Sequence, residues 1–191
     1  KNKICDACLN AKEKEKINWK ERENQLIKLL DKYRSKDGSY DCIVPGSGGK
    51  DSAMQAHLLK YKYGMHPLTI TWAPFIYTEI GWKNFIALKD CGFDNILMHS
   101  DGKLHRKLSL LAFDLHGDAW DPFGYGQEYL ALHLAVKYNI PLIFFGENGE
   151  VEYGGEDKHK NMVTAPMDDW SEIFYKGSSA QKLVEAGLKR N

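Results

Sequence analysis

The stretch Pro45-Gly46-Ser47-Gly48-Gly49-Lys50-Asp51-Ser52 decides the fold that this sequence predicts. A buried-looking run at residues 40–44 precedes it, and apolar residues at helical spacing follow it. This order predicts a β-strand, a loop and an α-helix. Glycine loops of this kind turn backbone N–H groups toward one point beside a helix N-terminus, where they can hold phosphate oxygens. Residues 45–52, called the glycine loop below, are therefore a candidate nucleotide site.

The small residues of the glycine loop suit a close approach to a ligand. Gly48 and Gly49 have no Cβ, so the backbone can adopt positive φ and come near a bound group without steric conflict. Ser47 and Ser52 can add hydroxyl donors. We expect all of them to contact a nucleotide.

The charged residues of the loop suit a pyrophosphate with its metal ion. Lys50 supplies a mobile cation, and Asp51 offers a hard oxygen ligand for Mg²⁺ that is held mainly by nucleotide phosphates. The spacing is neither that of a Walker loop nor Gly-x-Gly-x-x-Gly. The alternative is an ordinary glycine-rich turn in which Asp51 is only an acidic residue in the first turn of a helix.

Length and charge limit the class of protein. The 191 residues fit one domain of ordinary size with a small appendage. The 26 basic and 26 acidic side chains give a formal charge of zero, so bulk charge does not indicate a nucleic-acid partner. No apolar run is long enough for a membrane span, and no signal peptide precedes Ile4. We expect a cytoplasmic protein without a membrane partner.

The cysteines do not form the framework of a secreted domain. Cys42 and Cys91 are predicted to be buried thiols. Cys5 and Cys8 have the spacing of half a structural zinc knuckle, which a second pair of ligands normally completes. No second close pair follows, so a structural Zn²⁺ and an unmetallated pair are both open.

The order of elements predicts an α/β fold. A helix begins after Asn18, and further strands are predicted at residues 67–72, 95–99 and 140–145, with helices between them. Repeated βα units predict an open parallel sheet with helices on both faces, of the Rossmann-like type. The predicted segments are an N-terminal cysteine-pair segment with its helix (1–36), a nucleotide-binding domain (40–155) and a tail (156–191).

Two further loops are candidate parts of the site. The aromatic segment 116–126 is interpreted as a possible lid or a packed surface loop. The segment from Gly146 to Gly155 follows the fourth strand and carries Glu147 and Glu152. Ligands bind beyond the carboxyl ends of parallel strands, so this segment and Trp72, at the end of the second strand, are expected near the glycine loop. Trp72 is either an adenine contact or a core residue.

Several strings resemble known families. Ser47-Gly48-Gly49-Lys50-Asp51-Ser52 resembles the signature of the PP-loop ATP pyrophosphatases, which have the adenine nucleotide alpha hydrolase-like fold. Together with the cysteine pair, Trp72-Ala73-Pro74 and the segment 146–155, the chain resembles the N-acetyl sugar amidotransferases of the PseA/WbpG type. These enzymes act in bacterial surface-glycan biosynthesis, on sugars of lipopolysaccharide O-antigens and pseudaminic acid.

The resemblance implies a reaction and its participants. An acetamido group of a sugar becomes an acetamidino group through an O-adenylyl imidate, with release of AMP and pyrophosphate from ATP. The loop would hold pyrophosphate with Gly146 nearby, Asp51 would place Mg²⁺, and Lys50 would offset phosphate charge. Glu147 and Glu152 would orient the amide or ammonia, or cap local structure. No glutaminase signature is found, so a partner glutaminase would supply ammonia.

Two other hypotheses belong to different classes. A PP-loop tRNA-modifying enzyme, of the thiolation or lysidine type, would use the cysteine pair for metal or sulfur and a basic face for RNA. A non-enzymatic nucleotide sensor would bind ATP without forming AMP.

Overall fold

The structure is a computed structural model that describes residues 4–146 and 179–189. The chain forms two compact units, Lys1–Arg34 and Ser35–Asn191. In the described part of the chain, no helix has both the length and the apolar character needed to cross a membrane.

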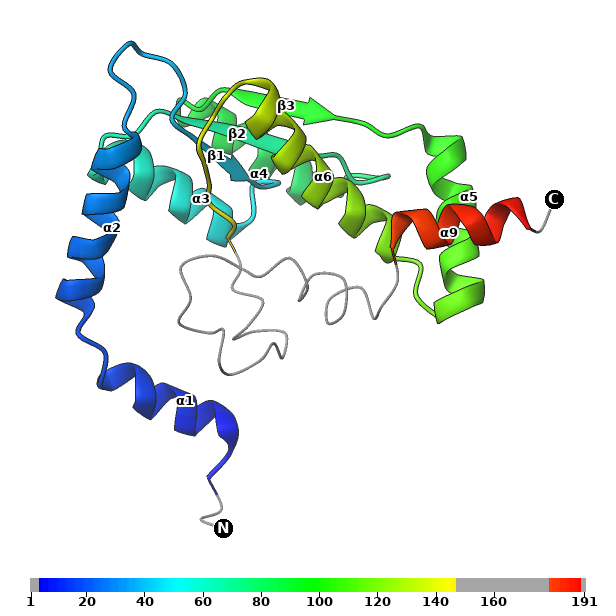
Figure 1. The fold of residues 1–191 in the computed structure, drawn as a ribbon, viewed down its shortest axis with the longest axis horizontal. Helices are drawn as coiled ribbons and strands as arrows, with labels where there is room; N and C mark the ends of the chain where they lie inside the picture. Colours follow the sequence, from blue (N-terminus) through cyan, green and yellow to red (C-terminus); the bar gives the residue numbers. More distant parts are fainter. Residues whose placement is uncertain (1–3, 147–178, 190–191) are drawn as a thin grey trace. The chain divides into compact units, whose positions relative to one another are not determined.

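The first unit contains helices α1 (Asp6–Glu15) and α2 (Trp19–Tyr33) (Figure 1). The Asn18 side chain accepts a hydrogen bond from the backbone N–H of Glu21 at 3.1 Å. This bond satisfies one of the N–H groups that the first turn leaves unpaired, which is why α2 begins where the sequence predicts.

The second unit is built on a parallel sheet of four strands, in the order β3-β2-β1-β4. The strands are β1 (Cys42–Pro45), β2 (Pro67–Trp72), β3 (Asn95–Met98) and β4 (Leu142–Ile143). Strand β1 pairs with β2 from Cys42 opposite Pro67, and with β4 from Cys42 opposite Leu142. The predicted α/β fold with an open parallel sheet is therefore confirmed.

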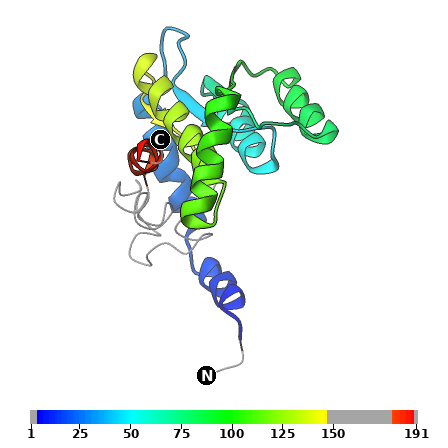
Figure 2. The same ribbon diagram turned by 90° about the vertical axis from the view of Figure 1, so that its right-hand side faces the viewer.

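The helices that connect these strands cover both faces of the sheet. They are α3 (Lys50–His57), which continues as the π-helix η1 (Leu58–Lys62), α4 (Glu79–Asp90), α5 (Gly102–His116) and α6 (Asp121–Lys137). Right-handed crossovers put α3 and α4 on one face, and the return from β3 to β4 puts α6 on the other. Figure 2 shows α6 on one side of the strands and α4 on the other. The order of the strands reverses between β1 and β4: β2 and β3 follow on one side of β1, and β4 lies on its other side.

The core lies between the sheet and α6. It contains Ile43, Leu68, Ile70, Leu130, Ala131, Leu134, Ala135 and Ile140, with Trp72 packed against it. Because side chains alternate along a strand, Ile70 and Trp72 face α6, whereas Thr69 and Thr71 face the opposite side. Both threonines are nevertheless only 1% exposed, so β2 is buried on both faces, as expected for a central parallel strand.

Helix α9 (Ala180–Leu188) belongs to the second unit and packs against α5. Ser179 accepts a hydrogen bond from the N–H of Lys182 at 3.2 Å and so caps its first turn. At Gly187, a Cβ would come within 3.1 Å of the Leu111 side chain, which shows how closely the two helices approach. This part of the predicted tail (156–191) therefore extends the fold of the second unit.

The prediction of a long loop at residues 116–126 was wrong. The connection ends at Trp120, and α6 begins at Asp121 with Pro122 in its first turn, where proline has no hydrogen bond to lose. Gly126 was predicted to lie in this loop, because glycine is common in turns, but it lies inside α6. A Cβ there would be only 2.2 Å from Cε2 of Trp72, so glycine permits helix and strand to touch.

The fourth strand is shorter than the predicted 140–145. Pro141 has no N–H for a ladder, so pairing begins at Leu142. The N–H of Phe144 still donates to the carbonyl of Ile43 at 2.8 Å, but the carbonyl of Phe145 accepts from a side chain. Cys42 is buried as predicted, whereas Cys91 is exposed because it lies at the C-cap of α4.

We predict that Gly126→Ala destabilises the protein by about 1–3 kcal/mol, because the added methyl group overpacks against the Trp72 indole. Chemical denaturation measures this free energy of unfolding. Gly102→Ala is the matched control, since nothing lies within 4 Å of its Cβ position at the start of α5. Equal stability of the two variants would contradict the close contact between α6 and β2.

Candidate functional site

The glycine loop leaves the carboxyl end of β1 and is tied to β2. The N–H of Gly46 donates to the carbonyl of Ile70 at 2.9 Å, and the carbonyl of Gly46 accepts from the Thr71 hydroxyl at 2.6 Å. A Cβ on Gly46 would collide with the Ser52 side chain, whose Oγ would be 2.4 Å away. The loop therefore folds back on its own helix, with Gly46 held by the neighbouring strand.

Gly48 holds the loop against α4. Its φ is +90°, and a Cβ would lie 2.7 Å from the carbonyl carbon of Asn84 and 2.8 Å from the nitrogen of Phe85. These are backbone atoms, which cannot move aside as the end of a side chain can. Both the backbone conformation and the close approach therefore require glycine.

The loop ends at the N-terminus of α3, which no side chain caps. Gly49 is the N-cap residue, and no atom of the described residues lies within 4 Å of its Cβ position. Ser47 next to it is exposed. An open space beside uncapped N–H groups and the positive end of a helix favours a bound anion.

Lys50 and Asp51 lie together at the start of α3. The Lys50 ammonium donates to both carboxylate oxygens of Asp51, at 2.8 and 2.7 Å. Their side chains are 88% and 51% exposed, so the ion pair contributes little to stability. Both groups can turn toward a ligand at small cost.

The end of β4 lies directly beside the glycine loop. A Cβ on Gly146 would be 3.1 Å from the nitrogen of Ser52 and 3.5 Å from Cβ of Asp51. The Gln55 side chain donates to the carbonyl of Phe145 at 2.6 Å. The segments after the first and fourth strands therefore meet where the chain reverses direction, which is the usual ligand position in open α/β sheets. Glu147 and Glu152 lie outside the described residues.

Trp72 ends β2 at the same edge of the sheet, but its side chain lies on the other face from α3. The indole packs against Gly126 and the core, and its Nε1 is buried without a hydrogen-bond partner in the described part of the chain. The contacts around Trp72 are thus those of a core residue.

His105 is a residue of this edge that the sequence did not single out from the basic residues around it. It is 4% exposed, and its Nδ1 is 2.8 Å from the Ser100 hydroxyl. Its ring centroid is 4.3 Å from that of Phe75 and 6.2 Å from that of Phe123. Burial lowers the pKa of His105 below its ordinary value of 6.5. His105 is therefore an uncharged residue of an aromatic cluster.

A buried polar network behind the loop was also missed. The Asn95 amide donates to the hydroxyls of Thr69 and Thr71, each at 3.0 Å, and Thr71 in turn donates to Gly46. Only the contacts with Asn95 in β3 and with Gly46 show that Thr71 orients the loop.

The cysteine pair lies in the first unit. Cys5 is the N-cap of α1, and both Cys5 and Cys8 are exposed. Within residues 4–146 and 179–189, no group of three or more histidine, cysteine, aspartate or glutamate residues is arranged to hold a metal ion. Zinc binding by the pair stays a prediction.

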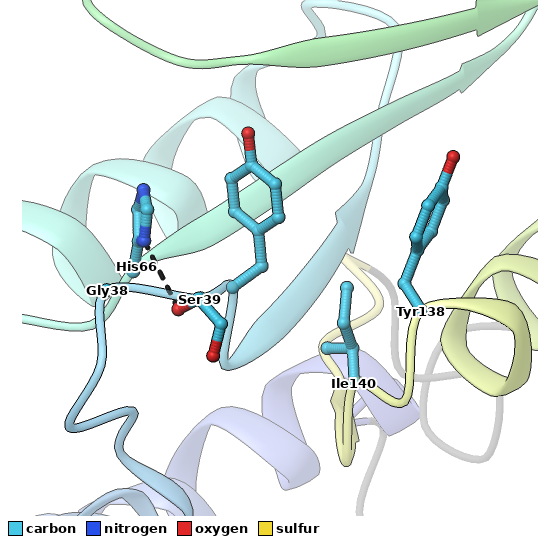
Figure 3. A pocket seen from close by; sticks show the side chains of 6 residues that line it. Gly38, Ser39, His66, Tyr138 and Ile140 are labelled. Carbon is cyan, nitrogen blue, oxygen red and sulfur yellow. Dashed lines mark hydrogen bonds between the residues drawn. The ribbon is translucent and has the colours of Figure 1, made fainter.

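A pocket of about 350 Å³ lies at the opposite edge of the sheet, near the amino ends of the strands. Its lining residues are Gly38, Ser39, Tyr40, His66, Tyr138 and Ile140 (Figure 3). Tyr40 donates to Asp94 at 2.8 Å and Nδ1 of His66 lies 3.2 Å from the carbonyl of Ser39, so these groups have structural partners. The pocket is separate from the glycine loop.

Comparison with known proteins gives one partial likeness. No family model matches the chain. A stretch of 67 residues is 34% identical to "Uncharacterized protein MJ1599" of Methanocaldococcus jannaschii. The stretch covers 35% of this chain and 24% of that protein, so the chain spans about a quarter of this relative.

We predict that Thr71→Val destabilises the protein by about 1–3 kcal/mol, because the buried carbonyl of Gly46 loses its donor. Thr71→Ser keeps the hydroxyl and is the control. Its loss of one buried methyl group is expected to cost less, about 0.5–1.5 kcal/mol. Denaturant unfolding compares the two, and a serine variant as unstable as the valine variant would rule out the hydroxyl's role.

We also predict that His105 makes stability fall in acid. Its folded pKa is lowered, so below about pH 6.5 the unfolded chain binds a proton that the folded protein excludes. Stability should decrease as the pH falls below this value, by at most about 1.4 kcal/mol per pH unit from this residue. His105→Phe should remove that part of the slope in unfolding measured between pH 7 and pH 5. An unchanged slope would contradict the assignment.

Proposed function

We propose that this chain is an ATP-dependent, AMP-forming amidotransferase that converts the acetamido group of a surface-glycan sugar to an acetamidino group. The observation that carries the proposal is the meeting of the glycine loop with the end of β4, where Gly146 lies beside Asp51 and Ser52. A phosphate-holding loop and a second strand-end segment at one place can bind two reactants next to each other.

The residues of the loop fit a nucleotide with its metal ion. The open space at Gly49 and the uncapped start of α3 suit the β- and γ-phosphates. Lys50 would offset their negative charge, and Ser47 and Ser52 would donate hydrogen bonds. Asp51 would hold Mg²⁺, which would supply positive charge to the departing pyrophosphate.

The proposed reaction has two steps whose atoms balance. The acetamido oxygen of the sugar attacks the α-phosphorus of ATP, pyrophosphate leaves, and the amide nitrogen loses its proton to give an O-adenylyl imidate. Ammonia then attacks the imidate carbon, and AMP leaves with the oxygen. Activation is needed because an amide oxygen is a poor leaving group. The glycine loop would bind the pyrophosphate and keep the α-phosphorus beside the sugar.

The described cysteines of the second unit favour an external source of ammonia. A glutaminase of the cysteine type needs a reactive thiolate, but burial raises the pKa of the Cys42 thiol well above its ordinary value. Cys91 is exposed at the end of α4 and lies in no nucleophile turn. A partner glutaminase would therefore supply the ammonia, as the family resemblance also implies.

The test is incubation of the protein with ATP, Mg²⁺, ammonium and a panel of activated N-acetyl sugars. We expect AMP, pyrophosphate and a sugar whose mass changes by the replacement of oxygen with NH, all lost in Asp51→Ala. Pyrophosphate release that depends on tRNA would instead favour the tRNA-modifying hypothesis. ATP binding that survives Asp51→Ala, with no AMP under any condition, would favour the sensor.

We predict that Gly49→Ala weakens ATP binding about tenfold, because its methyl group enters the space assigned to the phosphates. Its free energy of unfolding should stay close to that of the parent, since no atom of the described residues lies within 4 Å of the added methyl group. Isothermal titration and denaturant unfolding measure the two effects. Unchanged ATP affinity in this variant would place the phosphates elsewhere, and Gly102→Ala is the control for a general effect of a Gly→Ala change.

A further inference from the structure

Gln55 joins the two halves of the candidate site. It lies on α3 one turn after Asp51, and its Nε2 donates to the carbonyl of Phe145 at 2.6 Å. Phe145 immediately precedes Gly146, which is the residue beside Asp51 and Ser52. The Gln55 amide thus fixes where the segment after β4 begins relative to the glycine loop.

The other end of the same amide is unpaired. Oε1 of Gln55 has less than 1 Å² of exposed surface and has no hydrogen-bond partner among the residues that the structure describes. The amide keeps this orientation because its nitrogen donates to the Phe145 carbonyl, whereas the amide oxygen in that place could not donate. A buried acceptor without a donor costs free energy, and few such groups persist without a reason.

A ligand that carries a hydrogen-bond donor can pair with this oxygen. Ammonia and the acetamido group of the sugar carry such a donor, as do the adenine and ribose of ATP, whereas the phosphates assigned to the space at Gly49 carry none. Gln55 is bonded to the segment after β4, which is the half of the site assigned to the second reactant. We propose that Gln55 Oε1 is a subsite for the N–H donor of the nitrogen-bearing substrate in the amide-to-amidine reaction. This inference rests on the proposed function and names a residue that the resemblance does not assign.

The chemistry of the second step suits a neutral acceptor at this position. Ammonia that donates one hydrogen to Oε1 keeps its lone pair free for attack on the imidate carbon. A carbonyl oxygen also binds ammonia without holding it as a charged ammonium ion, as a carboxylate would tend to do. Because solvent does not reach Oε1, the end of β4 must move slightly to admit the donor, and the Gln55–Phe145 bond limits that movement.

Two substitutions of Gln55 distinguish the loss of its acceptor oxygen from the loss of its hydrogen bond to Phe145. Gln55→Met removes both polar ends with little change in volume, and Gln55→Glu keeps an acceptor oxygen but loses the donor to Phe145. We expect Gln55→Met to raise the KM for ammonium about fivefold to tenfold and to raise the ratio of AMP to amidine formed. The KM for ATP should change by less than about twofold in both variants, and Gln55→Glu should retain most of the ammonium affinity.

The same assays identify which substrate supplies the hydrogen-bond donor. A rise in the KM for the sugar instead of ammonium assigns the subsite to the acetamido N–H. Met54→Ala is the matched control, because Met54 is 59% exposed on the same helix. Thermal unfolding verifies that each variant folds, and Gln55→Leu is a second apolar variant if Gln55→Met does not.

Equal effects of Gln55→Met and Gln55→Glu on every KM, or no effect of either, would contradict the proposed subsite. Gln55 would then serve only to hold the segment after β4 through its hydrogen bond to Phe145. That result leaves the proposed function intact, provided that the parent protein still forms AMP and amidine. A parent protein that forms AMP with no amidine-bearing sugar would overturn both proposals, so the two failures are distinguishable.

Discussion

The pairing of β1 with two parallel neighbours is the constraint on which the rest of the structure depends. Strand β2 lies on one side of β1 and β4 on the other. After β1 the chain therefore runs outward through β2 and β3, and it then crosses back over the sheet to form β4 beside β1. The helices after β1 and before β4 then lie on opposite faces, so the carboxyl ends of these two strands lie between the connections that leave and return to the sheet. The glycine loop and Gly146 meet there.

Backbone contacts, more than side-chain charge, hold this edge of the sheet together. Gly48 lies against α4, Gly146 against the first turn of α3, and Gly126 against the indole of Trp72. Behind the loop, Thr71 and Asn95 form a buried hydrogen-bond network that ends on the carbonyl of Gly46. A loop fixed in this way keeps its N–H groups in place before a ligand arrives, which reduces the ordering that binding requires.

Much of the fold was predictable from local sequence. The ends of β2 and the N-cap of α2 follow from side chains within a few residues, so the prediction at Pro67–Trp72 and Asn18 agrees with the structure. The errors have two causes. At 116–126, glycine was interpreted by its turn propensity, although Gly126 serves a contact with a strand distant in the sequence. In the fourth strand, Pro141 was placed in the strand, although it has no N–H and pairing begins at Leu142.

The sequence by itself determined the alternation of strands and helices, and it identified the glycine loop, because a run of small residues between a strand and a helix is a local pattern. The tertiary structure decided which residues surround that loop. Gln55, Thr71 and His105 carry no local signal, since their roles depend on Phe145, Gly46 and Phe75, which other elements supply. Such long-range contacts arise only when parallel strands and crossover helices have packed together.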